Sequence, residues 1–174
     1  MIGPIHHVTL SVSDLDRSVA FYSSTLGFRP KLSAIVDDDE HRSYLRLAPG
    51  VMGRATIMQA PGTIAGSVEL IEWCTEDGRP IAESTPPKRP GDPGVCLLAL
   101  EVTAETLTEV YEWLASCGVT CWTAPVTMPI EGYGEISALV FEDPDGVMIE
   151  LLTLPSPEEA RRAHRDAQRS STIT

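Results

Sequence analysis

The chain has 174 residues, enough for a sizeable hydrophobic core, and its 43% hydrophobic and 22% charged residues are ordinary for a folded globular protein. A formal net charge of −12 repels nucleic-acid phosphates and anionic lipids, so we expect no nucleic acid and no membrane partner. No apolar run approaches the roughly 20 residues of a membrane span, and no secretory signal is visible. Four cysteines without a CxxC pair favour free thiols in a reducing, cytoplasmic compartment.

The first half of the chain predicts a strand, a helix and then further strands. Residues 5–12 (IHHVTLSV) are β-branched and apolar, which is typical of a short strand. Ser13-Asp14 offers a cap for a helix over 15–26, which Gly27 ends. Further strands are predicted over 29–36, 42–48, 55–60 and 67–73, separated by turns rich in Asp, Pro and Gly.

The second half repeats this order. A strand is predicted over 95–102, then a helix over 104–117 with Thr103 as its cap, then strands over 119–128, 135–143 and 147–154. Residues 76–94 contain five prolines, which favours an extended crossover between the halves. After Pro155, Ser156 and Glu159 form a capping-box pattern that begins a polar helix.

These elements predict an α+β fold of two tandem modules and a C-terminal helix. The first module covers about 5–75, the crossover 76–94 and the second module about 95–153. Together they form one domain over 1–155, and residues 156–174 form the C-terminal helix and tail.

Alternate side chains of a strand share a face, and this places polar residues together. His7 and Thr9 share one face of the first strand, and Glu69 interrupts the last apolar strand of the same half. Glu150 interrupts the equivalent strand of the second half. Two carboxylates in one cavity need a cation, a shared proton or a cationic ligand, and a divalent metal is the commonest solution.

A simpler interpretation stands beside the metal site. Glu69 and Glu150 could face solvent on edge strands, and a histidine near a strand start is more often exposed than ligating. His6, His41 and His164 are assigned no role, and His6 is expected to face away from His7.

Two longer motifs resemble a known family. IHHVTLSVSDLDRSVAFYSSTLGF resembles the opening of vicinal oxygen chelate proteins, and FEDPDGVMIELL resembles their closing motif. That superfamily includes glyoxalase I, extradiol dioxygenases, methylmalonyl-CoA epimerase and the fosfomycin- and bleomycin-resistance proteins. The resemblance covers residues 5 to about 153. It implies paired βαβββ modules that form an incomplete eight-stranded barrel around a cavity.

The resemblance also implies a ligand set for a divalent metal such as Zn, Ni, Mn, Mg or Fe(II). By position, His7, Glu69 and Glu150 occupy ligand slots, whereas the fourth slot holds Leu97, which cannot bind a metal. Tyr133, in a glycine-flanked loop, is a further catalytic candidate. The other cavity candidates are Thr9, Tyr44, Arg46, Met58, Trp73, Leu97 and Glu101.

The leading functional hypothesis is a metal-dependent lyase or isomerase acting on a small oxygen-bearing organic molecule, with Glu69 or Glu150 moving a proton. One alternative is a metal-free binding protein of the bleomycin-resistance kind, which the acidic charge and Leu97 favour. Another is a metal-free enzyme in which the two glutamates share a proton. An extradiol dioxygenase ranks lower, because such sites usually use two histidines and a carboxylate. A homodimer is a further expectation.

Overall fold

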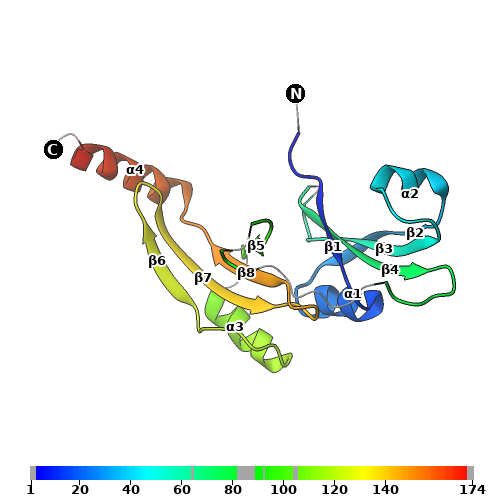
Figure 1. Cartoon of the computed structure of the whole chain (residues 1–174). Coiled ribbons are helices and arrows are strands. Elements are labelled where there is room, and N and C mark those ends of the chain that lie inside the picture. Colours follow the sequence, from blue (N-terminus) through cyan, green and yellow to red (C-terminus); the bar gives the residue numbers. More distant parts are fainter. Residues whose placement is uncertain (1–2, 64, 82–88, 92, 104–105, 172–174) are drawn as a thin grey trace. The chain divides into compact units, whose positions relative to one another are not determined.

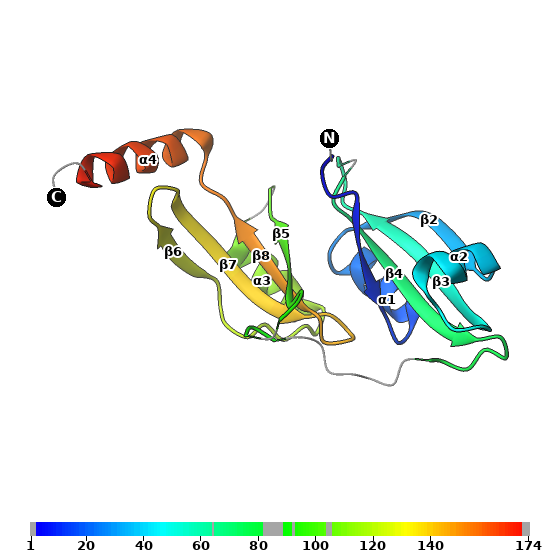
Figure 2. The same cartoon turned by 45° about the horizontal axis from the view of Figure 1, so that its top comes forward.

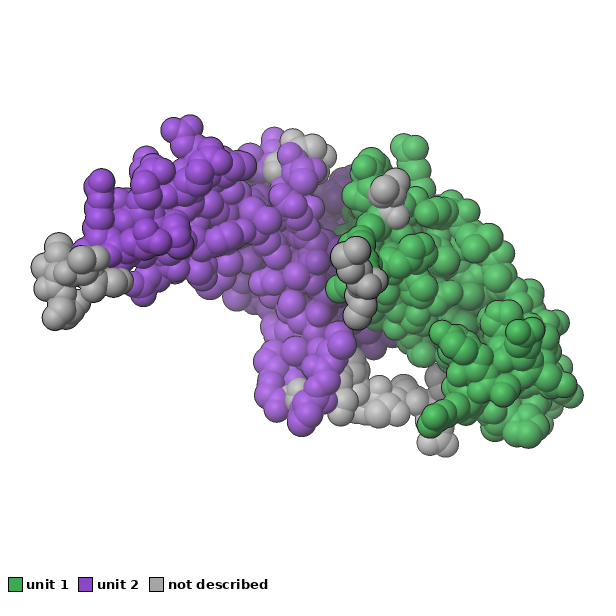
Figure 3. Space-filling view, turned by 90° about the horizontal axis from the view of Figure 1, so that it is seen from above, with its two compact units in different colours: residues 1–86 green, residues 87–174 purple. Residues whose placement is uncertain are grey.

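A computed structural model describes residues 3–63, 65–81, 89–91, 93–103 and 106–171 (Figure 1). The chain divides into two units, residues 1–86 and 87–174, which Figure 3 colours separately. Each unit contains one four-stranded mixed sheet. The predicted α+β class, the duplicated module and the C-terminal helix are therefore confirmed.

Unit 1 contains the elements β1 (His7–Ser11), α1 (Leu15–Ser24), β2 (Arg29–Val36), α2 (Asp39–Leu45), β3 (Val51–Gln59) and β4 (Ser67–Thr75). The strand order is β1-β4-β3-β2. β1 pairs with β4 in parallel, whereas the other neighbours are antiparallel. The first and last strands of the unit thus lie side by side.

Unit 2 contains β5 (Leu97–Glu101), α3 (Leu107–Ser116), β6 (Val126–Ile130), β7 (Gly134–Glu142), β8 (Met148–Thr153) and α4 (Pro157–Ser171). Its strand order, β5-β8-β7-β6, repeats that of unit 1, with β5 parallel to β8. The helix α4 packs beside the turn between β6 and β7, where a Cβ on Gly132 would lie 3.7 Å from Ala167.

One face of each sheet is covered by a helix, and burial there holds each unit together. In unit 1, α1 packs on this face and the side chains of Tyr22, Met58 and Leu70 are fully buried. In unit 2, α3 plays the same part over Phe141 and Ile149. Burial of each such side chain stabilises the fold by about 1.5–3 kcal/mol. Met58 was a predicted cavity residue, and that prediction is wrong, because Met58 lies under α1.

The opposite face of each sheet, away from α1 or α3, is called the open face below. Exposure alternates along β1, where His7, Thr9 and Ser11 are exposed and the residues between them are half-buried. In unit 1 the helix α2 stands on the other side of the sheet from α1 (Figures 1 and 2). His7 and Thr9 of β1 and Glu69 of β4 lie on the open face.

The predicted strand over 42–48 is wrong, because this segment forms most of α2. Asp38 caps the helix by accepting a hydrogen bond from the N–H of His41 at 2.8 Å. Asp39 and Glu40 place negative charge in the first turn, which complements the helix dipole. The helix ends at Arg46, which adopts a left-handed conformation with φ 55°. The acidic residues that were predicted to form a turn therefore form the N-terminus of α2.

The other helix starts follow the sequence closely. Asp14 caps α1 by accepting from the N–H of Arg17. The predicted cap of α3 at Thr103 is wrong: Thr106 caps it in a capping box with Glu109, and residues 104–105 lie outside the described part. At α4 the predicted capping box is confirmed: the N–H of Ser156 donates to Glu159 Oε2 at 2.9 Å, and the N–H of Glu159 donates to Ser156 Oγ at 3.3 Å.

All four cysteines are free thiols, as predicted. The part of the crossover that the structure describes includes Arg89, which forms an ion pair with Glu142 at 2.7 Å and lies over the ring of Trp122. The rest of the crossover, residues 82–88 and 92, falls outside the described residues. Among the described helices, none is long and apolar enough to cross a membrane.

Candidate functional site

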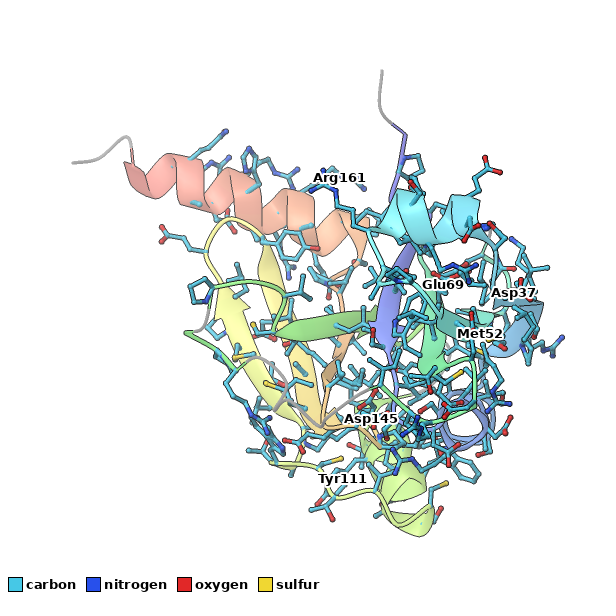
Figure 4. All side chains as sticks on the ribbon, turned by 45° about the vertical axis from the view of Figure 1, so that its right-hand side comes forward. Asp37, Met52, Glu69, Tyr111, Asp145 and Arg161 are labelled. Atoms are coloured by element: carbon cyan, nitrogen blue, oxygen red, sulfur yellow. The ribbon has the colours of Figure 1, made fainter. Side chains whose placement is uncertain are left out.

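The parallel pairing of β1 and β4 creates a polar cluster on the open face of unit 1. Thr9 pairs with Glu69 in register, so their side chains share a face. Thr9 Oγ1 donates a hydrogen bond to Glu69 Oε2 at 2.7 Å. His7 Nε2 lies 3.7 Å from the same oxygen. Figure 4 shows Glu69 beside β1. We call His7, Thr9 and Glu69 the polar cluster.

Within the polar cluster, Nε2 of His7 and the carboxylate of Glu69 are accessible to a ligand. The His7–Glu69 distance is too long for a hydrogen bond, so Nε2 of His7 is not committed to the carboxylate. The hydroxyl of Thr9 donates to the carboxylate and fixes its orientation. The side chains of His7 and Glu69 are 37% and 24% exposed, which leaves them accessible to a ligand.

Sequence reasoning missed His6, which was expected to face away from His7. Instead, the two Nδ1 atoms lie 2.8 Å apart, a hydrogen-bond distance, and the rings meet edge to face with centroids 5.1 Å apart. His6 precedes β1, so the strict alternation of an extended strand does not apply to it. The adjacent HH pair was the signal that could have indicated this contact.

Glu72, the other glutamate of β4, lies on the opposite face of the sheet from Glu69. Glu72 points to the α1 side, where its Oε2 lies 2.6 Å from Arg54 and accepts a weaker contact from the N–H of Leu15 at 3.4 Å. The hydrogen bond from Arg54 to Glu72 raises the pKa of the guanidinium. Glu72 thus serves helix attachment and belongs to no ligand site.

The open face of unit 1 becomes apolar beyond the polar cluster. Trp73 donates from Nε1 to Ser11 Oγ at 3.2 Å, and its ring covers Gly53, where an added Cβ would lie 2.8 Å from ring carbon Cζ3. Trp73 also packs against a buried group of Val36, Ala55 and Ile71. The predicted cavity residues Thr9 and Trp73 therefore both lie on this face.

The open face of unit 2 carries the second glutamate in an apolar setting. Glu150 is half-buried between its register partners Ala99 and Val140. Within unit 2, no hydrogen bond or ion pair joins it to another described residue. Leu97 and Glu101 lie on the same face of β5, and Glu101 is exposed. Burying an unpartnered carboxylate costs free energy, which is a common sign of a functional group.

Three predicted site residues lie elsewhere in the units. Tyr44 is on α2 and is 81% exposed, and Arg46 is the left-handed residue that ends α2. Tyr133 lies in the tight turn between β6 and β7, where its N–H donates to the carbonyl of Ile130 at 3.0 Å. Among the described residues of unit 1, no hydrogen bond or ion pair joins Tyr44 or Arg46 to the polar cluster, and the roles of all three residues stay predictions.

The donor set of the polar cluster fits part of a divalent metal site. Two ligands at tetrahedral bond lengths of about 2 Å lie roughly 3.3 Å apart, close to the 3.7 Å between His7 Nε2 and Glu69 Oε2. Within either unit, the described residues hold no group of three His, Cys, Asp or Glu side chains that could bind a metal. A complete site needs a third ligand, and Glu150 in that role stays a prediction.

Comparisons with known proteins agree with this architecture. Residues 4–151 match the model of the Glyoxalase/Bleomycin resistance protein/Dioxygenase superfamily. A crystal structure of a member of that superfamily from Sphaerobacter thermophilus is 28% identical, with a TM-score of 0.55 over 87% of this chain and 98% of the other. A glyoxalase family protein from Bacillus cereus is 17% identical, with a TM-score of 0.70 over 88% and 95%.

A duplicated module with a polar open face defines a fold class shared by enzymes and ligand-binding proteins. The chain belongs to the glyoxalase/bleomycin resistance/dioxygenase superfamily, whose model matches most of its length. Membership establishes the fold, which enzymes and ligand-binding proteins share.

Proposed function

We propose that the protein is a metal-dependent lyase or isomerase acting on a small oxygen-bearing organic molecule. The observation that carries the proposal is the convergence of His7 and Glu69 on the open face, with Thr9 holding the carboxylate. An imidazole and a carboxylate are the ligands that divalent transition metals commonly bind in enzymes. We propose Glu150 as the third ligand, which would leave positions free for substrate oxygens.

Each residue has a distinct task in this proposal. A bound divalent ion supplies Lewis-acid stabilisation of negative charge on the substrate oxygens. His7 and Glu69 hold it, and Thr9 keeps Glu69 in one orientation. Glu150 has no partner among the described residues of unit 2, so one of its oxygens could accept a proton from the carbon next to the substrate oxygens. The electron pair of that C–H bond would move onto the substrate oxygens as an enolate, and Glu150 would return the proton to a carbon of the product.

A metal-free binding protein is the second candidate, and the open face of unit 2 favours it. Leu97 stands where a fourth ligand would be, and Glu150 is flanked by Ala99 and Val140. An apolar wall with one carboxylate suits an organic cation. The net charge of −12 would attract such a ligand. This candidate predicts tight binding without turnover.

The deciding experiment is metal analysis of the purified protein after reconstitution with single divalent ions. We expect one equivalent in the wild type and a loss of at least about tenfold in affinity in Glu69→Gln and in Glu150→Gln. Glu72→Gln is the matched control, because Glu72 lies on the same strand but faces α1. Its metal content should equal that of the wild type.

The outcomes separate the candidate functions. No stoichiometric binding of any divalent ion would overturn the metal proposal and favour either the binding protein or an acid–base pair of Glu69 and Glu150. Turnover of a small oxygen-bearing substrate without metal would identify the acid–base pair. Iron(II)-dependent consumption of dioxygen would instead identify a dioxygenase.

A further inference from the structure

We propose that His6 is a positioning residue that fixes the tautomer of His7 and so prepares Nε2 of His7 for a metal ligand role. The metal part of this inference rests on the proposed function. The observation behind it is the 2.8 Å contact between the two Nδ1 atoms. His6 itself touches no other member of the polar cluster in the described contacts, so it acts through His7.

The hydrogen bond restricts the two rings to complementary tautomers. When both imidazoles are neutral, one Nδ1 must carry the proton and the other must accept it. If His7 donates, its Nε2 keeps a lone pair. If His6 donates, the Nε2 of His7 carries the proton and cannot bind a metal ion. The pair therefore decides whether His7 is a ligand.

The surroundings of His7 favour its role as the donor. A proton on Nε2 of His7 would have only water as an acceptor, because the carboxylate oxygen Glu69 Oε2 is 3.7 Å away and already accepts from Thr9. A proton on Nδ1 of His7 has His6 as a partner at hydrogen-bond distance. Imidazole ligands of metals commonly donate their second N–H in this way.

The backbone holds His6 in place for this task. The carbonyl of His6 accepts a hydrogen bond from the N–H of Ser67 at 3.0 Å, and the carbonyl of Ile5 accepts from Gly66 at 3.0 Å. These bonds extend the pairing of β1 with β4 beyond the strand itself. Because Ser67 is two residues before Glu69, the same segment positions both His6 and the carboxylate.

The test replaces His6 by residues that keep or remove the acceptor. His6→Asn places an amide oxygen near the position of Nδ1, whereas His6→Leu removes the acceptor. His164→Leu, on α4 of unit 2, is the matched control. Long-range ¹H–¹⁵N NMR reads the tautomer of His7 in the metal-free protein, in buffer alkaline enough to keep imidazoles neutral. Titration with Zn²⁺ gives the affinity.

We expect His7 to carry its proton on Nδ1 in the wild type and in His6→Asn, and to shift toward the Nε2–H form in His6→Leu. Zinc affinity should fall about 10–100-fold in His6→Leu and stay near the wild-type value in His6→Asn and the control. An Nε2 proton on His7 in the wild type, or an unchanged tautomer in His6→Leu, would overturn the inference.

The two readouts keep this inference separate from the proposed function. If Zn²⁺ fails to bind the wild type while the tautomer shifts as expected, the metal proposal fails and the positioning role of His6 holds. If Zn²⁺ binds equally to all variants, the proposed function survives and the inference fails. Dispersed amide spectra of His6→Leu confirm that the variant is folded.

Discussion

The two modules have the same strand order but differ in the chemistry of their open faces. In module 1, β1 places His7 and Thr9 near Glu69 of β4. The corresponding positions of β5 in module 2, beside Glu150 of β8, are Leu97 and Ala99. The glutamate of the last strand is present in both modules. Both modules therefore have a buried core and a carboxylate on the open face, but only module 1 has the polar side chains of His7 and Thr9 beside that carboxylate.

The two open faces therefore suit different kinds of contact. In module 1 the carboxylate is oriented by Thr9 and lies near an imidazole, which suits the holding of an ion. In module 2 the carboxylate of Glu150 lies among apolar side chains, which suits contact with the body of an organic ligand.

The largest effect is expected where the modules are alike, in their cores. Phe141→Ala removes a fully buried side chain and should lower the free energy of unfolding by about 3–5 kcal/mol. Tyr22→Ala should have a similar effect in module 1. Tyr44→Ala, at an 81% exposed position, should change the free energy of unfolding by less than about 0.5 kcal/mol. Urea denaturation measures all three, and equal values for core and surface would refute the assigned cores.

A smaller effect is expected at Gly53, where module 1 has a tryptophan across its open face. An alanine Cβ would lie 2.8 Å from the ring of Trp73, which its bond to Ser11 holds in place. Gly53→Ala should cost about 1–3 kcal/mol and change the tryptophan emission spectrum. Gly3→Ala, with open space around the new Cβ, is the control. Unchanged emission and stability would show that Trp73 does not lie over Gly53.

The difference at Leu97 can be reversed. Leu97→His restores an imidazole at the position in module 2 that corresponds to His7. If Leu97 belongs to the proposed metal site, affinity for the ion should rise about tenfold, or about 1.4 kcal/mol. Calorimetric titration of the metal-free protein measures the change in metal affinity. Leu97→Met is the control, because it keeps the apolar volume at this position. Leu98→His is not suitable, because Leu98 faces α3. An unchanged affinity in Leu97→His would show that this position lies away from the ion.

The smallest effect concerns the capping box of α3. The backbone N–H of Thr106, and then its hydroxyl, lower the pKa of the Glu109 carboxyl. A carboxyl whose pKa is lower in the folded state adds stability above its unfolded pKa, and this is lost as the pH falls through the folded value. Thr106→Val should raise the pKa of Glu109 only in part, because the backbone donor remains. Carboxyl NMR titration measures this, and an unmoved midpoint would argue against the hydroxyl contact.

Most of the fold could be predicted from local patterns, because hydrophobic alternation and helix caps act over a few residues. The strand predicted over 42–48 failed because the segment is a short run with several apolar residues, while Asp38 and Arg46 supply a helix start and a helix end. A short apolar run does not by itself distinguish a strand from a helix. The incomplete barrel around a cavity depends on how the modules meet, and it stays a prediction.

The candidate site was predictable in part for a similar reason. Alternation predicts that His7 and Thr9 share one face of the first strand, but the register that pairs Thr9 with Glu69 comes only from the structure. The contact of His6 with His7 could not be predicted either, since it depends on backbone geometry just outside the strand. A side chain at a strand boundary escapes the rule of alternating faces.

The parallel pairing of β1 with β4 also sets when the site can form. Thr9 and Glu69 are 60 residues apart in the chain, so no partial module can bring them together. Contacts between such distant residues close late, because the intervening loop must lose its freedom first. During synthesis, the polar cluster therefore stays incomplete until β4 has emerged. A ligand that then binds selects the finished module over every partly folded form.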